Sequence, residues 1–153
     1  MDMKKCLPLL LACLLFTVLG FGEADSDRPC DVRMLNGDYG FSISGSRPTL
    51  TAAGPAIEQI LGVAHTHFYG DGTLSQEDNI HGSIGGWETH DRPGTGSYTV
   101  NSDCSGTMTI QSDGTPTPPL LTLRIEVVDQ GREVRTVVVE PAAVMVTSNG
   151  RRK

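Results

Sequence analysis

The sequence predicts an all-β protein, a small antiparallel barrel of about eight strands. Short stretches in which apolar and polar residues alternate recur along the 153-residue chain, and such alternation is typical of strands with one buried face. Turns rich in glycine or proline separate these stretches, and no stretch shows sustained helical periodicity. Closing the sheet into a barrel would remove its exposed edges. A two-sheet β-sandwich is the alternative that the same pattern allows.

The central hairpin of this fold is predicted between residues 94 and 112. Apolar side chains alternate with polar ones before a polar centre and again after it. An odd-length loop at that centre would place the apolar residues of both arms on one face. The predicted cross-strand pairs are Val100 with Met108 and Tyr98 with Ile110.

The remaining strands follow from the same alternation and from the turn signals between them. The expected strands are residues 35–44, 55–69, 73–84, 120–129, 132–140 and 142–147; the expected loops are 45–54, 85–94 and 113–119, the last with three prolines. Residues 52–61 could also hold one or two helical turns.

Residues 120–140 give the clearest hairpin, with Gln130-Gly131 as its turn. The predicted inner pairs are Leu123 with Val138, Ile125 with Thr136 and Val127 with Val134; the predicted outer pair is Glu126 with Arg135. One face is then apolar and the other charged, which favours this register. We expect Glu126, Glu133 and Arg135 to form an exposed charge group, the alternative being a polar site inside the barrel.

Residues 1–24 are expected to be a secretory signal peptide, followed by a single β-barrel domain over residues 25–153. The segment has two early lysines, an apolar run over residues 7–21 and Gly22-Glu23-Ala24 as a cleavage site. The alternative is a retained membrane anchor, but the run is shorter than the roughly 20 residues that a spanning helix needs. We therefore expect a secreted or periplasmic protein.

Cys30 and Cys104 are the two cysteines that remain after such a cleavage. In an oxidising compartment a disulfide is the expected state of an isolated pair. Two free buried thiols are the alternative. A metal pair is less favoured, because neither cysteine has a second cysteine two to four residues away.

The net charge of −6 argues against nucleic acid and anionic membrane surfaces as partners. Arg151, Arg152 and Lys153 form a short basic end that we expect to be a solvated tail. Asp103 lies in a segment resembling the start of a calcium loop, but position twelve of that loop is a serine. We expect Asp103 to cap the central turn instead.

His65 and His67 alternate along one predicted strand and could hold a metal with a third ligand. Glu77, His81 or His90 could supply that ligand if the fold brings one of them close. The alternative, which we favour, is that both histidines face solvent while Phe68 and its alternating neighbours face inward. We therefore expect no metal and no cofactor.

Four segments occur in a fixed order along the chain: Leu35-Asn-Gly-Asp-Tyr-Gly-Phe41, Phe68-Tyr-Gly-Asp-Gly72, Gly96-Ser-Tyr-Thr-Val-Asn-Ser-Asp-Cys-Ser-Gly106 and Val127-Val-Asp-Gln-Gly-Arg-Glu-Val134. This set of segments resembles a group of small secreted bacterial proteins of unknown function. In such proteins a cysteine precedes the first strand, as Cys30 does here, and this supports its bond to Cys104. The architecture looks like calycin and allene-oxide-cyclase-like barrels, which include cyclases that enclose an apolar substrate. No catalytic motif of theirs matches here, so the catalytic residues are unknown.

Two functions fit these expectations. The first is a barrel that binds a small apolar molecule, or an isomerase or cyclase built on such a barrel. Its ligand-binding wall would contain Tyr39, Phe41, Phe68 and Tyr98, the bulky members of the alternating runs. The second is a secreted structural or interaction module whose core is filled and which holds no ligand.

Overall fold

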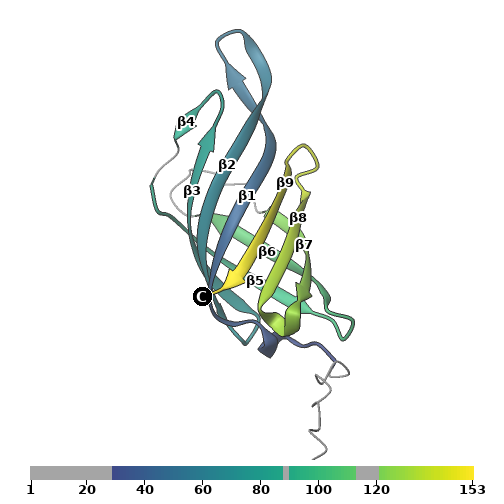
Figure 1. The fold of residues 1–153 in the computed structure, drawn as a ribbon. Coiled ribbons are helices and arrows are strands. Elements are labelled where there is room, and N and C mark those ends of the chain that lie inside the picture. The colour runs from purple at the N-terminus through teal and green to yellow at the C-terminus, as the bar shows by residue number, and fades with distance from the viewer. Residues whose placement is uncertain (1–28, 88–89, 113–120) are drawn as a thin grey trace, which may run out of the picture.

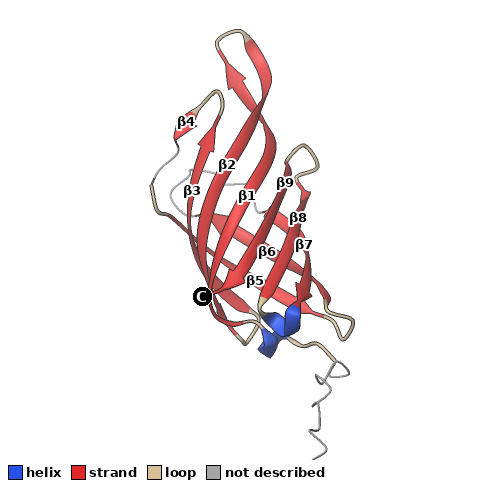
Figure 2. Cartoon of the chain, in the orientation of Figure 1, coloured by secondary structure: helices blue, strands red, loops and turns tan. Residues whose placement is uncertain are grey.

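The computed structural model describes residues 29–87, 90–112 and 121–153, and these residues form a closed antiparallel barrel of eight strands (Figure 1). A further two-residue strand, β4, lies outside the barrel. The strands are β1 (Asn36–Thr51), β2 (Gly54–Tyr69), β3 (Thr73–Gly82), β4 (Gly86–Trp87), β5 (Arg92–Val100), β6 (Ser105–Ser112), β7 (Leu121–Val128), β8 (Glu133–Glu140) and β9 (Met145–Arg152). Two short 3-10 helices, η1 (Val32–Met34) and η2 (Asp129–Gly131), lie at one end of the barrel (Figure 2).

Neighbouring strands pair in the order β2-β1-β9-β8-β7-β6-β5-β3, and a β2–β3 pairing closes the ring. All of these pairings are antiparallel, and most join strands that follow one another along the chain. The predicted barrel is therefore confirmed, and the β-sandwich alternative is wrong. Among the described residues, no helix is long and apolar enough to cross a membrane.

The β7–β8 register is the one predicted from the sequence. Leu123 lies opposite Val138, Ile125 opposite Thr136, Val127 opposite Val134 and Glu126 opposite Arg135. Glu126 and Arg135 are exposed on the outer face, and Arg135 Nε lies 2.8 Å from a Glu133 carboxylate oxygen. The expected exposed charge group is therefore present on the outside of the barrel.

The β5–β6 register differs from the prediction by two residues. Tyr98 pairs with Met108, and Val100 pairs with Gly106. The turn is tighter than expected because the Ser105 backbone N–H donates to the Asp103 carboxylate at 3.0 Å, the predicted capping role. A shift of two residues keeps every side chain on its predicted face.

Several predicted boundaries are wrong. Residues 45–54 are not a loop and residues 52–61 are not helical, because β1 and β2 each run for 16 residues and form a hairpin that projects past the barrel (Figure 1). β4 and the start of β5 occupy part of the expected loop 85–94. The last strand is Met145–Arg152 rather than residues 142–147. The expected signal peptide (1–24) and loop 113–119 lie outside the described residues.

The basic end of the chain is exposed, as expected of a solvated tail, but it is not a tail. Arg151 and Arg152 belong to β9 and both pair with β1, and Arg151 also pairs with Glu133 of β8. The Arg152 guanidinium donates to the carbonyl oxygen of Met34 at 2.7 Å, and the Lys153 N–H donates to the carbonyl oxygen of Asp38 at 2.9 Å. These bonds attach the C-terminus to the end of the barrel where η1 lies.

Candidate ligand cavity

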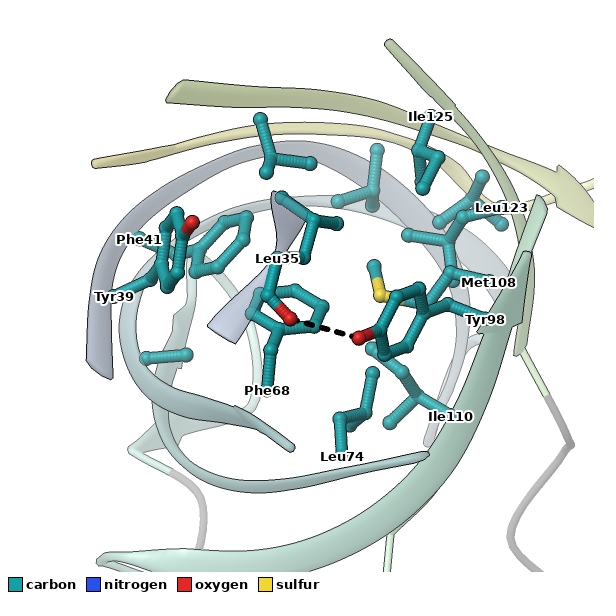
Figure 3. Packing of buried hydrophobic residues seen from close by; sticks show 14 of the residues in the cluster. Leu35, Tyr39, Phe41, Phe68, Leu74, Tyr98, Met108, Ile110, Leu123 and Ile125 are labelled. Carbon is teal, nitrogen blue, oxygen red and sulfur yellow. Dashed lines mark hydrogen bonds between the residues drawn. The ribbon is translucent and has the colours of Figure 1, made fainter. Parts of the chain in front are cut away.

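The end of the barrel next to η1 is closed by three aromatic side chains, Tyr39, Phe68 and Tyr98, which we call the aromatic floor. Phe68 packs edge-on against Tyr39 and against Tyr98, with ring centroids 5.0 Å apart in both pairs. The Tyr98 hydroxyl donates to the carbonyl oxygen of Leu35 at 2.8 Å (Figure 3). The Tyr39 hydroxyl donates to the carbonyl oxygen of Gly131. The floor is therefore packed, and its polar atoms are paired.

The Cys30–Cys104 disulfide lies at the same end. It joins the segment that enters η1 to the turn between β5 and β6, with Cα atoms 5.0 Å apart. The Cys30 N–H also donates to the carbonyl oxygen of Ser102 at 3.2 Å. The predicted disulfide is confirmed, and it holds the N-terminal segment against the barrel end that the floor closes.

Beyond the floor, the barrel encloses a cavity of about 190 Å³, which we call the lumen cavity. Its apolar lining residues are Phe41, Ile43, Ile60, Ala64, Ile80, Met108, Ile110, Leu121, Leu123, Val138, Val144 and Val146. Its polar lining residues are Arg47, Gln76, Asp78, Arg92, Ser112, Thr136 and Ser148. Most of the described wall is therefore apolar, and all strands of the barrel contribute to it.

The four aromatic residues predicted to form the ligand-binding wall occupy two levels of the barrel. Phe41 lines the lumen cavity, whereas Tyr39, Phe68 and Tyr98 form the floor. All four are buried, as the alternation predicted. The height of each aromatic ring along the barrel axis depends on the stagger of the strands and on the carbonyl groups near η1 and η2 that the tyrosines bind. The alternation of apolar and polar residues predicts which side chains point inward, but not their height in the barrel.

Phe41 is able to lie against the barrel wall because the facing residue on β9 is a glycine. Gly150 pairs with Phe41, and a Cβ atom at position 150 would lie 2.3 Å from the tip of the Phe41 ring. Such a distance is far below van der Waals contact, so any other residue here would push the ring aside. The glycine thus keeps the ring on the wall.

A polar cluster of Gln76, Asp78 and Arg92 interrupts the apolar wall on the β3–β5 side. Arg92 donates to both carboxylate oxygens of Asp78, from Nε at 2.9 Å and from Nη2 at 3.0 Å. Gln76 donates to Asp78 Oδ2 at 3.1 Å and accepts a bond from Thr66 at 3.3 Å. The sequence did not predict this cluster, because polar residues in an alternating run are expected on the outer face of a strand. Asp78 is in fact only 4% exposed.

Thr136 and Ser148 form a second polar pair on the β8–β9 side of the cavity. Their hydroxyl oxygens lie 2.7 Å apart, which is a hydrogen bond across the two strands. Ser112, at the end of β6, places a further hydroxyl in the wall. The cavity is thus apolar, with hydroxyl groups at two places.

Glu58 and Arg47 lie where the β1–β2 hairpin leaves the barrel. The buried Glu58 carboxylate accepts bonds from Arg47 Nε at 2.8 Å and from the Gly85 N–H at 3.0 Å. The Gly85 N–H, followed by Arg47, lowers the pKa of Glu58 below its ordinary value of 4.5. This carboxylate therefore connects the projecting hairpin to the segment between β3 and β4.

The paired histidines lie on the outer face of β2. His65 and His67 are partly exposed, while Ala64, Thr66 and Phe68 are buried, which is the alternative that the sequence analysis favoured. Asp38 Oδ1 lies 3.0 Å from His65 Nε2 and 2.8 Å from His67 Nδ1. Hydrogen bonds from His67 and then His65 lower the pKa of Asp38. In the described part of the chain, no cluster of three or more His, Cys, Asp or Glu side chains could hold a metal ion.

Fold and cavity together define the class of this protein: a closed eight-stranded antiparallel barrel with a disulfide at its closed end and an internal cavity. Comparison with protein-family models, curated proteins and solved structures finds no match to this chain. Its function must therefore be argued from the lumen cavity.

Proposed function

We propose that this protein is a secreted barrel that binds a small apolar molecule in its lumen. The observation that carries the proposal is the cavity of about 190 Å³. Protein interiors are normally packed as densely as organic crystals, with few voids larger than a water molecule. An empty space of this size inside a barrel lowers stability, and binding of a ligand is a physical reason for a protein to keep it.

The size and chemistry of the wall restrict the ligand. Twelve of the nineteen described lining residues are apolar, and they come from every side of the barrel. An apolar cavity of about 150 Å³ in another protein holds one benzene molecule. The present cavity therefore suits a compact molecule of roughly ten non-hydrogen atoms, such as one or two fused rings.

The ligand would enter from the end of the barrel opposite the floor. At the floor, Leu35, Tyr39 and Phe68 are fully buried and the disulfide closes the chain around them. At the other end, the lining residues Arg47, Arg92 and Val144 are only half-buried. Water therefore reaches the lining at that end, and a small molecule would follow the same route.

The resemblance to small secreted bacterial proteins and to allene-oxide-cyclase-like barrels supports this proposal. The disulfide is compatible with export, since such bonds persist in oxidising compartments. We propose binding rather than an isomerase or cyclase activity. Asp78, the carboxylate among the described lining residues, is already bound by Arg92 and Gln76 and is therefore poorly placed to transfer protons.

Filling the cavity tests this function. Naphthalene fluorescence would be titrated with the parent protein, with Ala64→Phe and with Val63→Phe. Ala64 lines the cavity, whereas the neighbouring Val63 points outward and is 58% exposed. We expect the parent and Val63→Phe to bind naphthalene and Ala64→Phe to bind it at least tenfold more weakly.

If the parent protein does not bind naphthalene, or if Ala64→Phe binds it equally well, the proposal is wrong and the filled module is the better description. Thermal melting of each variant shows whether it is folded. Ala64→Leu, a smaller addition at the same position, replaces Ala64→Phe if the larger ring prevents folding.

A further inference from the structure

We infer that the ligand carries an uncharged oxygen, a hydroxyl or a carbonyl, that forms a hydrogen bond with Ser112 while its apolar part fills the lumen cavity. This inference rests on the proposed function and specifies the chemical class of the ligand. It comes from one hydroxyl group in the wall of the cavity and from the charge balance of that wall.

Ser112 is the last residue of β6 and lies on its inner face. The residue is 9% exposed and lines the lumen cavity. Its hydroxyl forms no hydrogen bond within the described part of the chain. The Thr136 and Ser148 hydroxyls in the same wall do bond to each other. Ser112 is therefore a nearly buried residue whose hydroxyl has no hydrogen-bond partner among the described residues.

The Ser112 hydroxyl is not sealed from solvent. Across the described residues, every side-chain nitrogen or oxygen that is sealed from solvent has a hydrogen-bond partner. The Ser112 oxygen has none, so it is not sealed by packed side chains. An apolar ligand that displaces water from this hydroxyl would leave it without a hydrogen-bond partner, which is unfavourable, whereas a ligand with an oxygen atom at this position would supply one.

The strand next to Ser112 approaches it closely. Ser112 pairs with Gly94 on β5, whose inner face has no side chain at this level. A Cβ atom at position 94 would lie 3.0 Å from the Gln111 carbonyl oxygen and 3.4 Å from the Ser112 Cα. Any larger residue at position 94 would therefore press on the strand end that carries the hydroxyl.

The surroundings of Ser112 favour an uncharged group. Arg92, two residues from Gly94 on the same face of β5, binds the Asp78 carboxylate through two nitrogen atoms. Arg47, the other arginine among the described lining residues, binds the Glu58 carboxylate at 2.8 Å. Both positive charges are thus balanced by buried carboxylates. A charged ligand would enter a mostly apolar space in which the charges are already matched, which is costly.

The test compares three probes that share one ring system: naphthalene, 2-naphthol and 2-naphthoate. Each would be titrated with the parent protein, with Ser112→Ala and with Ser112→Thr, which keeps the hydroxyl. We expect Ser112→Ala to weaken 2-naphthol binding roughly three- to tenfold, the usual effect of losing one hydrogen bond. Naphthalene binding should change less than about twofold, because that probe has no oxygen. Ser112→Thr should retain the binding of 2-naphthol.

The outcomes separate this inference from the proposed function. If naphthalene binds but Ser112→Ala weakens both probes equally or neither, the inference is wrong and the apolar site remains. If 2-naphthoate binds the parent more tightly than 2-naphthol does, the ligand oxygen is charged and the inference is also wrong. If none of the three probes binds the parent, the proposed function itself is refuted.

Discussion

Phe41 lies between the aromatic floor and the lumen cavity. One side of its ring packs against other residues, and the other side borders the cavity. Its ring lies against Gly150 and 6.4 Å from the Phe68 ring centroid, and the residue also lines the cavity. Phe68, in contrast, is fully buried between two tyrosines. The two phenylalanines therefore differ in how many partners each would lose on truncation.

Phe41→Ala should cost less stability than Phe68→Ala. For Phe68→Ala we expect a loss of about 3–5 kcal/mol in the free energy of unfolding, as in other filled cores. For Phe41→Ala we expect about 2 kcal/mol, because one side of the ring already lacks partners. Urea unfolding of both variants measures the difference. If both variants lose about 3–5 kcal/mol, the space beside Phe41 is filled by other side chains.

Tyr98→Phe tests the hydrogen bonds of the floor. The Tyr98 hydroxyl donates towards the carbonyl oxygens of Leu35 at 2.8 Å and Val32 at 3.0 Å. Its removal should cost about 1–3 kcal/mol, since it takes a donor away from the buried carbonyl oxygen of Leu35. Tyr69→Phe is the matched control, because Tyr69 is 51% exposed and bonds only to Ser75 among the described residues. If Tyr98→Phe lowers the free energy of unfolding as little as Tyr69→Phe does, the Tyr98 hydroxyl does not form the hydrogen bonds described for the aromatic floor.

At the scale of elements, the β1–β2 hairpin depends on the buried Glu58 carboxylate. Arg47 and the Gly85 N–H both donate to it, and they lower its pKa in the folded protein below 4.5. A group with a lowered folded pKa stabilises the protein above its unfolded pKa and loses that effect as pH falls through the folded value. Glu58→Gln should therefore cost about 1–3 kcal/mol at pH 7.

The difference in the free energy of unfolding between the parent protein and Glu58→Gln should become smaller when the pH falls from about 6 to about 3. Urea unfolding at several pH values measures it. Glu77→Gln is the control, since Glu77 is exposed on the outer face of β3 and its replacement should change stability by no more than about 0.5 kcal/mol. If Glu58→Gln lowers the free energy of unfolding by the same amount at every pH in this range, Glu58 does not contribute to stability as an ionised carboxylate.

The disulfide stabilises the closed end of the barrel through the segment that carries η1. It spans 74 residues of sequence, and loop-closure entropy predicts a contribution on the order of 4 kcal/mol. Cys30→Ser with Cys104→Ser should lower the melting temperature markedly, as should reduction of the parent. A melting temperature that does not change would show that the bond adds nothing to the fold.

How well the sequence predicted each element depended on how regularly it alternates. The inner face of the β7–β8 hairpin is apolar from Leu123 to Val127 and at Val134 and Val138, so the register could be predicted pair by pair for the residues that follow the shift between Thr122 and Leu123. The far part of β1 contains Gly45, Arg47 and Pro48, and its inner face holds the Arg47–Glu58 ion pair instead of apolar side chains. Alternation therefore fails there, although the strand continues.

The same reasoning explains which parts of the candidate site were found. The four aromatic residues were correctly placed on inner faces, because bulky apolar side chains mark the buried side of a strand. Asp78, Arg92 and Ser112 were missed, because alternation assigns polar residues to solvent. Only the closed barrel, with Asp78 beside Arg92 and Ser112 beside Gly94 on neighbouring strands, makes them part of one wall.

At the scale of the whole molecule, the barrel is divided along its axis. One end is closed by the aromatic floor (Figure 3), by the two 3-10 helices (Figure 2) and by the disulfide. The middle holds the lumen cavity, and its half-buried residues lie towards the other end. The barrel is therefore closed at one end, and its cavity is reached from the other end. This geometry suits the proposed binding of a small ligand.

The most direct test of this account is a crystal structure of the protein soaked with bromobenzene, with the bromine located from its anomalous scattering. Bromobenzene is apolar and smaller than the roughly ten non-hydrogen atoms that the cavity suits. We predict a bromine peak inside the barrel, within contact distance of Phe41, Ala64 or Met108, which line the cavity. A lumen filled by side chains, or bromine peaks only on the outer surface, would contradict the account.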